Sequence, residues 1–364
     1  MFRVYSDKFY SDPQIQKNFE EKYVAKIIEV AKNIELKESK RKKKKSSNYE
    51  LTNKAIKELF DEFHSVIPEF PQTFEELLKL SPKNISSVYV KYKNDNTLQE
   101  KVDKALKNVV GPKNGTRELL NYSDDFSSTI IDYFILSEHE DVYTIKTCFY
   151  CNHAYINTFS YPQEDEEPLN EEETKKKQQF DLDHFIPKGS CPLFSLCLYN
   201  FVPSCQVCNS RIKLKNEYYD GKTAEEIEKL FPTSKEYNYT DSLRFHIRHI
   251  KEDPRFDPSD PKYVKNKDDF DIELETIGDN IYLDEADAFK IIPRYRKHIV
   301  EFLTYIDKAR KYPKSYFLLL ASQKSQKEAD SLQEAIFNHR LRNDEKQIFQ
   351  KIYNDIDKTL ENEE

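Results

Sequence analysis

Two Cys-x-x-Cys motifs constrain this chain more than any other feature of its sequence. They are Cys148-Phe-Tyr-Cys151 and Cys205-Gln-Val-Cys208. Each motif can turn two thiolates toward one ion, and four thiolates complete the closed, tetrahedral site of a structural zinc. The alternative is that the cysteines are reduced and buried without a metal, but two such motifs in one region favour zinc. We therefore expect a zinc site that joins two distant segments of the chain.

The composition is typical of a helix-rich globular protein. The chain has 364 residues, enough for two or three structural units, and only 5 of them are glycine. No stretch approaches the ~20 apolar residues of a membrane span, and the N-terminus lacks an apolar signal sequence. We expect a soluble, cytoplasmic protein without membrane contact, in which Cys191 and Cys197 are small buried residues. The net charge of −8 argues against broad coating of nucleic acid, although a groove needs only local positive charge.

Helical periodicity dominates the first part of the chain. The predicted first helix carries an apolar stripe of Ile15, Phe19, Tyr23, Ile27, Ala31 and Ile34. Thr73 with Glu76 forms a capping box, which predicts the start of another helix. Leu98 to Val109 carries a further helical repeat, which Gly111-Pro112 ends.

Two charged segments interrupt the predicted helices and strands. Six consecutive basic residues occupy positions 40–45, and their mutual repulsion predicts a mobile loop over 40–47. This run is either a contact to a nucleic-acid backbone or a solvated loop. Residues 161–179 are acidic and then basic, and we expect them to form a mobile insertion in a hairpin.

Strand signals appear in the middle of the chain. Apolar and polar residues alternate over 155–159 and 180–183. Later, Phe270 to Glu275 alternates in the same way and is followed by a Gly-Asp-Asn turn and Ile281 to Leu283, which predicts a β-hairpin near 270–283. The fold class is therefore α+β. We expect three regions: a mainly helical region 1–146, a small core 147–220 with strands and zinc, and a mainly helical region 221–364.

The chemistry of the core centres on Asp183-His184, at the end of a predicted strand. An aspartate can hold a hard cation such as Mg²⁺, and a neutral histidine can take a proton from water. Adjacent strand residues point to opposite faces, so a local irregularity must bring the two to one site. Alone, the pair is a weak signal, because a surface aspartate beside a half-buried histidine is common.

Two asparagines accompany this pair. Asn200 precedes the second cysteine motif, and Asn209 follows Cys208 directly. Asn209 can open a helix and present its carbonyl oxygen to a metal, or it can be an ordinary helix cap. Its place beside a zinc cysteine favours a metal ligand.

Together, these motifs resemble the HNH nucleases with a four-cysteine zinc site. The resemblance covers about a fifth of the chain and is more specific than any single motif. It implies a ββα-metal fold in which Asp183 and Asn209 hold a catalytic Mg²⁺ or Mn²⁺ and His184 is the general base. It also implies that Asn200 braces the loop and orients the histidine. Asn209 replaces the last histidine of the motif, which favours a hard metal.

The resemblance implies metal-assisted hydrolysis of a phosphodiester bond. The metal would stabilise the leaving 3′ oxygen while His184 activates water. Four local cations could hold flanking phosphates or could line a solvated helix face: Lys188, Arg211, Lys213 and Lys215. By contrast, we expect His246 and His249 to be surface or packing residues.

The C-terminal flank carries a looser resemblance. Phe289 to Pro313 is similar to the helical tail of HNH effectors from Septu and retron anti-phage systems, which pair with an ABC-type ATPase. This implies an ATPase partner, with DNA as the substrate and phage defence as the role.

Two other functions stay open from the sequence. One is an HNH nuclease in restriction, recombination or RNA cleavage, since the motif handles a phosphodiester without reading sequence. The other is a non-catalytic zinc ribbon that binds proteins. The intact Asp183-His184 and Asn209 argue against the second alternative.

Overall fold

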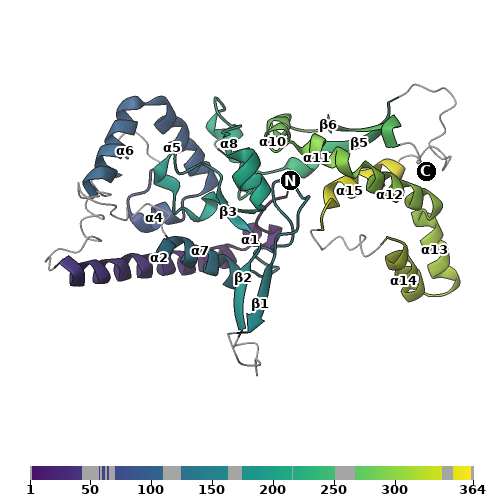
Figure 1. Cartoon of the computed structure of the whole chain (residues 1–364), viewed down its shortest axis with the longest axis horizontal. Helices are drawn as coiled ribbons and strands as arrows, with labels where there is room; N and C mark the ends of the chain where they lie inside the picture. The colour runs from purple at the N-terminus through teal and green to yellow at the C-terminus, as the bar shows by residue number, and fades with distance from the viewer. Residues whose placement is uncertain are drawn as a thin grey trace.

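The computed structural model describes residues 2–42, 57, 60–61, 64, 70–109, 124–162, 174–214, 216–250, 267–337 and 347–361. Helices occupy both ends of an elongated molecule, and short antiparallel strand pairs lie between and beside them (Figure 1). The predicted α+β class is confirmed at this level. In the described part of the chain, no helix is both long and apolar enough to cross a membrane.

The N-terminal helices form where the apolar periodicity predicts them. They are α1 (Asp7–Ser11), α2 (Pro13–Lys42), α4 (Phe74–Leu78), α5 (Pro82–Asn94), α6 (Asn96–Val109) and α7 (Asp124–Leu136). The predicted stripe on α2 is buried at Phe19 and Tyr23, and the Tyr133 hydroxyl of α7 donates to the Phe19 carbonyl (2.5 Å). Thr73 caps α4 by accepting from the Glu76 amide (3.2 Å).

The basic run and the insertion differ from their predicted extents. Helix α2 continues through Lys42, so the first half of the run at 40–45 is helical, and positions 43–45 lie outside the described residues. Strands β1 (Thr158–Pro162) and β2 (Thr174–Gln178) extend into the predicted insertion 161–179 from both sides. Their hairpin projects from the body of the molecule in Figure 1, and residues 163–173 lie outside the described part.

The central pair of strands leads directly into a helix. Strand β3 (Asp181–His184) runs antiparallel to β4 (Phe201–Ser204), with Asp183 opposite Val202. Two 3₁₀ turns, η2 (Pro192–Phe194) and η3 (Leu198–Asn200), lie in the connection. A π-helix, η4 (Val207–Lys213), follows β4 and contacts β3. This order gives a strand–strand–helix unit.

The predicted hairpin at 270–283 is wrong in its second strand. Strand β6 (Phe270–Thr276) forms as predicted, but it pairs with β5 (Leu243–His249). Gly278, two residues after β6, lies so close to the residue before β5 that an added Cβ would lie 3.0 Å from Ser242 Cα. The predicted second strand, Ile281 to Leu283, instead lies at the start of helix α10 (Tyr282–Ala288). Tyr282 is buried, and its hydroxyl donates to the Lys229 carbonyl (2.9 Å).

The remaining C-terminal elements are mainly helices. They are α8 (Ala224–Leu230), α9 (Tyr239–Ser242), η6 (Lys267–Asp269), α10 (Tyr282–Ala288), α11 (Ile291–Tyr295), η7 (Arg296–His298), α12 (Ile299–Lys311), α13 (Lys314–Gln323), α14 (Gln326–Phe337) and α15 (Gln350–Glu361). Buried apolar side chains from Val4 to Ile356 belong to one connected core within the described residues. The central unit therefore packs against both helical flanks.

Candidate metal centre and adjoining polar site

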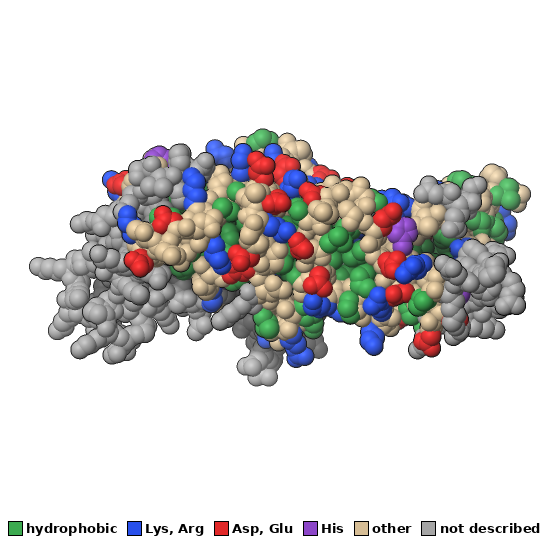
Figure 2. All heavy atoms as spheres, turned by 90° about the horizontal axis from the view of Figure 1, so that it is seen from above, with side chains coloured by type: hydrophobic (Ala, Val, Ile, Leu, Met, Phe, Trp, Pro, Cys, Tyr) green, Lys and Arg blue, Asp and Glu red, His purple; other side chains and the backbone are tan. Residues whose placement is uncertain are grey.

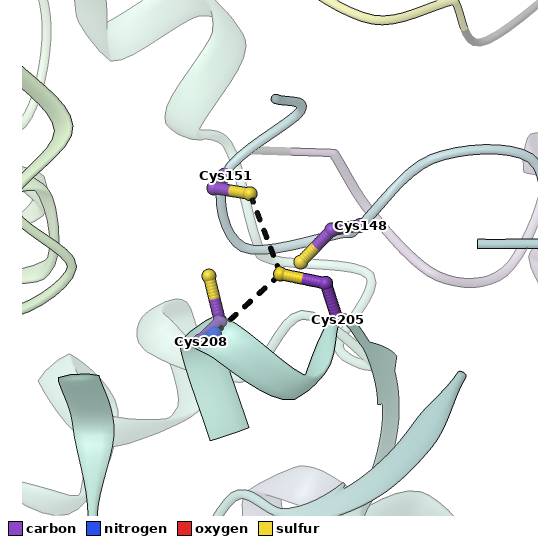
Figure 3. A group of neighbouring side chains, drawn as sticks. All are labelled: Cys148, Cys151, Cys205 and Cys208. Atoms are coloured by element: carbon purple, nitrogen blue, oxygen red, sulfur yellow. Dashed lines mark hydrogen bonds between the residues drawn. The ribbon is translucent and has the colours of Figure 1, made fainter. Parts of the chain in front are cut away.

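The two cysteine pairs meet at one point, as Figure 3 shows. Their ligand atoms lie within 4.8 Å of one another, and all four side chains are buried. The sulfur atoms of Cys151 and Cys205 are 4.0 Å apart. A tetrahedron with zinc–sulfur bonds of about 2.3 Å has an edge of ~3.8 Å, so this spacing suits zinc. The predicted joining of the two motifs is confirmed, and the cluster is positioned to hold a metal ion.

Backbone geometry turns the sulfurs of each pair to the same side. In the first motif, the amide of His153 faces Cys151 Sγ at 3.4 Å. Asn152 makes this turn with a φ of 46°, a left-handed conformation that asparagine tolerates better than most residues. In the second motif, the amide of Cys208 faces Cys205 Sγ at 3.5 Å. Such amide donors favour the thiolate form, which is the form that binds metal.

The carboxylate of Asp183 is buried and already has partners. Its Oδ2 accepts from the Tyr150 hydroxyl (2.6 Å) and from the ammonium of Lys213. Lys213 is only 1% exposed and also donates to the carbonyls of His184 (2.6 Å) and Phe185 (3.1 Å). Burial lowers the pKa of Lys213, while the Asp183 carboxylate acts in the opposite direction. These bonds fasten the end of η4 to β3.

Asn209 contacts a second carboxylate on the same strand. Its Nδ2 donates to Asp181 Oδ2 (3.1 Å), and the Ser210 hydroxyl donates to the same oxygen (3.4 Å). Because strand side chains alternate, Asp181 and Asp183 share one face of β3. Two carboxylates of β3 and the amide of Asn209 on η4 therefore lie where η4 packs against β3. In this structure Asn209 bonds to Asp181, while Asp183 bonds to Lys213.

His184 is the last residue of β3 and is half-buried beside the ring of Phe201, with 4.9 Å between ring centroids. Its Nε2 lies 2.9 Å from the Ser195 carbonyl. A carbonyl can only accept, so Nε2 carries the proton and Nδ1 carries the lone pair. Burial lowers the pKa of His184 to about 4, although the bond to Ser195 and the Asp183 carboxylate oppose this shift. The imidazole is therefore neutral at pH 7.

Asn200 is fully buried and holds the loop after β3. Its Oδ1 accepts from the Ile186 amide (2.8 Å), and its Nδ2 donates to the carbonyls of Ile186 and Phe194 (both 3.0 Å). The Phe185 amide also donates to the Asn200 backbone carbonyl (2.8 Å). This side chain joins the segment after His184 to the segment that carries Ser195, the partner of the imidazole.

The four expected phosphate-contacting cations have different surroundings. Lys188 and Arg211 are exposed. Lys213 is buried and donates to Asp183, which excludes the solvated helix face that was its alternative to a phosphate contact. Lys215 lies outside the described residues. On the face drawn in Figure 2, Lys and Arg side chains are interspersed with Asp and Glu.

Three residues of this region were missed by sequence reasoning. Asp181 precedes Asp183 by two residues, and strand alternation could have placed it on the same face. Tyr150 lies inside the first cysteine motif. A shared metal site brings this motif close to the Asp-His pair, and that was the signal for a contact between its hydroxyl and Asp183. Arg294 contacts Cys208 Sγ (3.3 Å) from α11, far along the chain, and no local pattern indicates it.

Comparison with known proteins gives no match for this chain: no family model, no curated protein and no solved structure matches it.

Proposed function

We propose that this chain is an HNH-type endonuclease that hydrolyses phosphodiester bonds in nucleic acid, with DNA as its substrate. The observation that carries the proposal is the β3–β4–η4 unit, which presents Asp183-His184 on a strand and Asn209 on the following helix. The four-cysteine cluster lies at the start of that helix, which is the order and location that the motif requires.

Zinc suits the cysteine cluster and has a structural role in this proposal. Four buried thiolates fill all tetrahedral positions, so no position remains for water or substrate. The cluster joins the segment before β1 to the helix after β4. Zinc binding then supplies folding free energy to a unit with only two short strands.

The donor atoms beside η4 suit a second, hard cation. Asp181 and Asp183 offer carboxylate oxygens and Asn209 offers an amide oxygen, which are the ligand types that Mg²⁺ and Mn²⁺ prefer. When bound, such an ion would polarise the phosphodiester and stabilise charge on the leaving oxygen. Lys213 already donates to Asp183 Oδ2, so this ammonium and a metal ion would share one carboxylate.

The chain's own residues then account for proton transfer. With Nε2 protonated and bonded to Ser195, the Nδ1 lone pair of His184 can take a proton from the attacking water. The water oxygen forms a bond to phosphorus as the bond to the 3′ oxygen breaks. Asn200 maintains this orientation by holding the two segments on either side of the imidazole.

A defence role with an ABC-type ATPase partner extends the proposal. It is supported by the resemblance of Phe289 to Pro313 to the tail of anti-phage effectors. This segment covers α11 and α12, which contact the zinc cluster and α15. A partner that binds the C-terminal helices would therefore be connected to the central unit through direct contacts.

Plasmid cleavage tests the nuclease proposal. The purified full-length protein is incubated with supercoiled plasmid in Mg²⁺ or Mn²⁺, beside His184→Ala and an EDTA control. His246→Ala is the matched variant, because His246 lies on β5 and bonds to Glu275 (2.7 Å) away from the site. We expect wild type and His246→Ala to nick or linearise DNA and His184→Ala to be inactive. The proposal would be overturned if the folded, zinc-loaded wild type cleaved no plasmid DNA and no single-stranded RNA, whether the ATPase partner was present or absent.

A further inference from the structure

Arg294 connects the C-terminal region to the cysteine cluster. Its Nη1 donates to Cys208 Sγ (3.3 Å) and to the Phe289 carbonyl (3.2 Å), and its Nη2 lies 3.3 Å from His153 Nδ1. The next residue, Tyr295, is buried and donates its hydroxyl to the Cys151 carbonyl (2.8 Å). Helix α11 therefore contacts both cysteine motifs.

The charge of the cluster explains why a guanidinium is placed there. Four thiolates around one divalent zinc leave two negative charges in excess, and the cluster is buried. Burying an uncompensated charge is costly, and a charge-assisted hydrogen bond reduces that cost. Guanidinium is always protonated and has five N–H donors, so Arg294 can bind a sulfur, a carbonyl and an imidazole together.

The neighbouring histidines hold this guanidinium in one orientation. Arginine only donates, so His153 Nδ1 accepts from Arg294 and His153 Nε2 carries the proton. That Nε2 lies 2.8 Å from Nε2 of His298, whose Nδ1 lies 3.2 Å from Glu301 Oε1. One set of tautomers satisfies every contact, and the bonds run in one direction from Arg294 to Glu301.

We infer that Arg294 is a positioning residue of the metal centre: it neutralises part of the thiolate charge and makes metal retention depend on the C-terminal region. The inference depends on metal binding by the four cysteines, as proposed above, and does not depend on nucleic-acid cleavage. If Arg294 only packed against the cluster, its replacement would leave metal affinity unchanged. If it compensates the thiolate charge, its replacement lowers metal affinity.

Metal affinity and spectroscopy of full-length variants test this role. Arg294→Gln keeps a polar side chain but removes the charge, and Arg294→Lys keeps the charge but removes the planar fork. Arg296→Gln is the matched control, because Arg296 is bonded to Asp271 (2.5 and 2.7 Å) on β6. Zinc affinity is measured by competition with a chelator, and Co²⁺ replaces zinc to record thiolate-to-cobalt charge-transfer absorption.

Arg294→Gln should lower zinc affinity about 10- to 100-fold, the usual range for outer-shell partners of metal ligands, and should shift the charge-transfer bands. Arg294→Lys should recover part of both effects, and Arg296→Gln should match wild type. If Arg294→Gln fails to fold, the zinc affinity and spectra of Arg294→Lys are compared with those of wild type instead. Wild-type affinity and spectra in both Arg294 variants would overturn the inference while leaving the metal site intact. A wild type that binds no metal would overturn the metal site and this inference together.

Discussion

Replacing Lys213 by methionine should destabilise the protein far more than removing an ordinary surface lysine. The ammonium is buried and bonds to Asp183 Oδ2 and to two carbonyls, those of His184 and Phe185. Methionine keeps most of the apolar stem but leaves the buried Asp183 carboxylate without its cation. Removing one partner of a buried ion pair costs about 3–5 kcal/mol, and we expect a loss in that range.

The assay is urea unfolding at pH 7 with zinc held constant, with each free energy of unfolding compared with wild type. Lys229→Met is the control, because Lys229 also forms a hydrogen-bonded ion pair, with Asp279 (2.9 Å), but is 47% exposed. An exposed pair of this kind contributes less than about 1 kcal/mol. The difference between the two variants isolates the effect of burial.

The double variant Lys213→Met with Asp183→Asn separates the ion pair from general packing. Once the carboxylate is neutral, losing the ammonium leaves no unpaired charge, so the double variant should be more stable than the sum of its two parts predicts. A Lys213→Met loss no larger than that of Lys229→Met would refute the reasoning. Strict additivity in the double variant would refute it equally.

Two further predictions concern the metal and pH. Cys205→Ser should abolish stoichiometric zinc binding and cooperative unfolding of the central unit, whereas Cys191→Ala, a buried cysteine outside the cluster, should keep its zinc by elemental analysis. Burial raises the pKa of Glu285 from 4.5 to about 7, so the folded state holds its proton while the unfolded state ionises. Stability from this group is therefore complete below pH 4.5 and is lost as pH rises to about 7. Glu285→Gln should remove that dependence. Its stability relative to wild type in urea unfolding should rise by about 2.5 kcal/mol between pH 5 and 8, and a constant difference would contradict this.

Local periodicity was enough to predict the helices but not the pairing of strands. The stripe on α2 and the Thr73 cap of α4 depend on residues three or four apart, and both formed, although the Glu76 carboxylate accepts from the Gln72 amide (2.7 Å) and not from Thr73 as a full capping box requires. The partner of β6 is β5, a segment well separated in sequence. Pairing of this kind is decided by packing across the chain, which alternation within one strand does not record.

The cysteine cluster was predictable because ligand chemistry specifies it regardless of distance along the chain. The surroundings of Lys213 were predictable in principle but were misjudged. Asn209 and Lys213 are four residues apart on one helix, so a helix that turns Asn209 toward β3 also turns Lys213 toward β3. A solvated Lys213 was therefore not compatible with a metal-binding Asn209 on the same helix. Arg294 had no such signal, since its contact with Cys208 depends on how α11 packs.

Lys213 also changes what the polar site can bind. Asp181 and Asp183 with the Lys213 ammonium carry a single negative charge in excess. One divalent ion among them would leave a single positive charge, which attracts a phosphodiester; without Lys213, the same ion would only bring the site to neutrality. The buried lysine thus stabilises the fold by compensating the charge of Asp183. Under the proposed function, the same positive charge also favours binding of the negatively charged phosphodiester. Stability and substrate affinity should therefore fall together when Lys213 loses its charge.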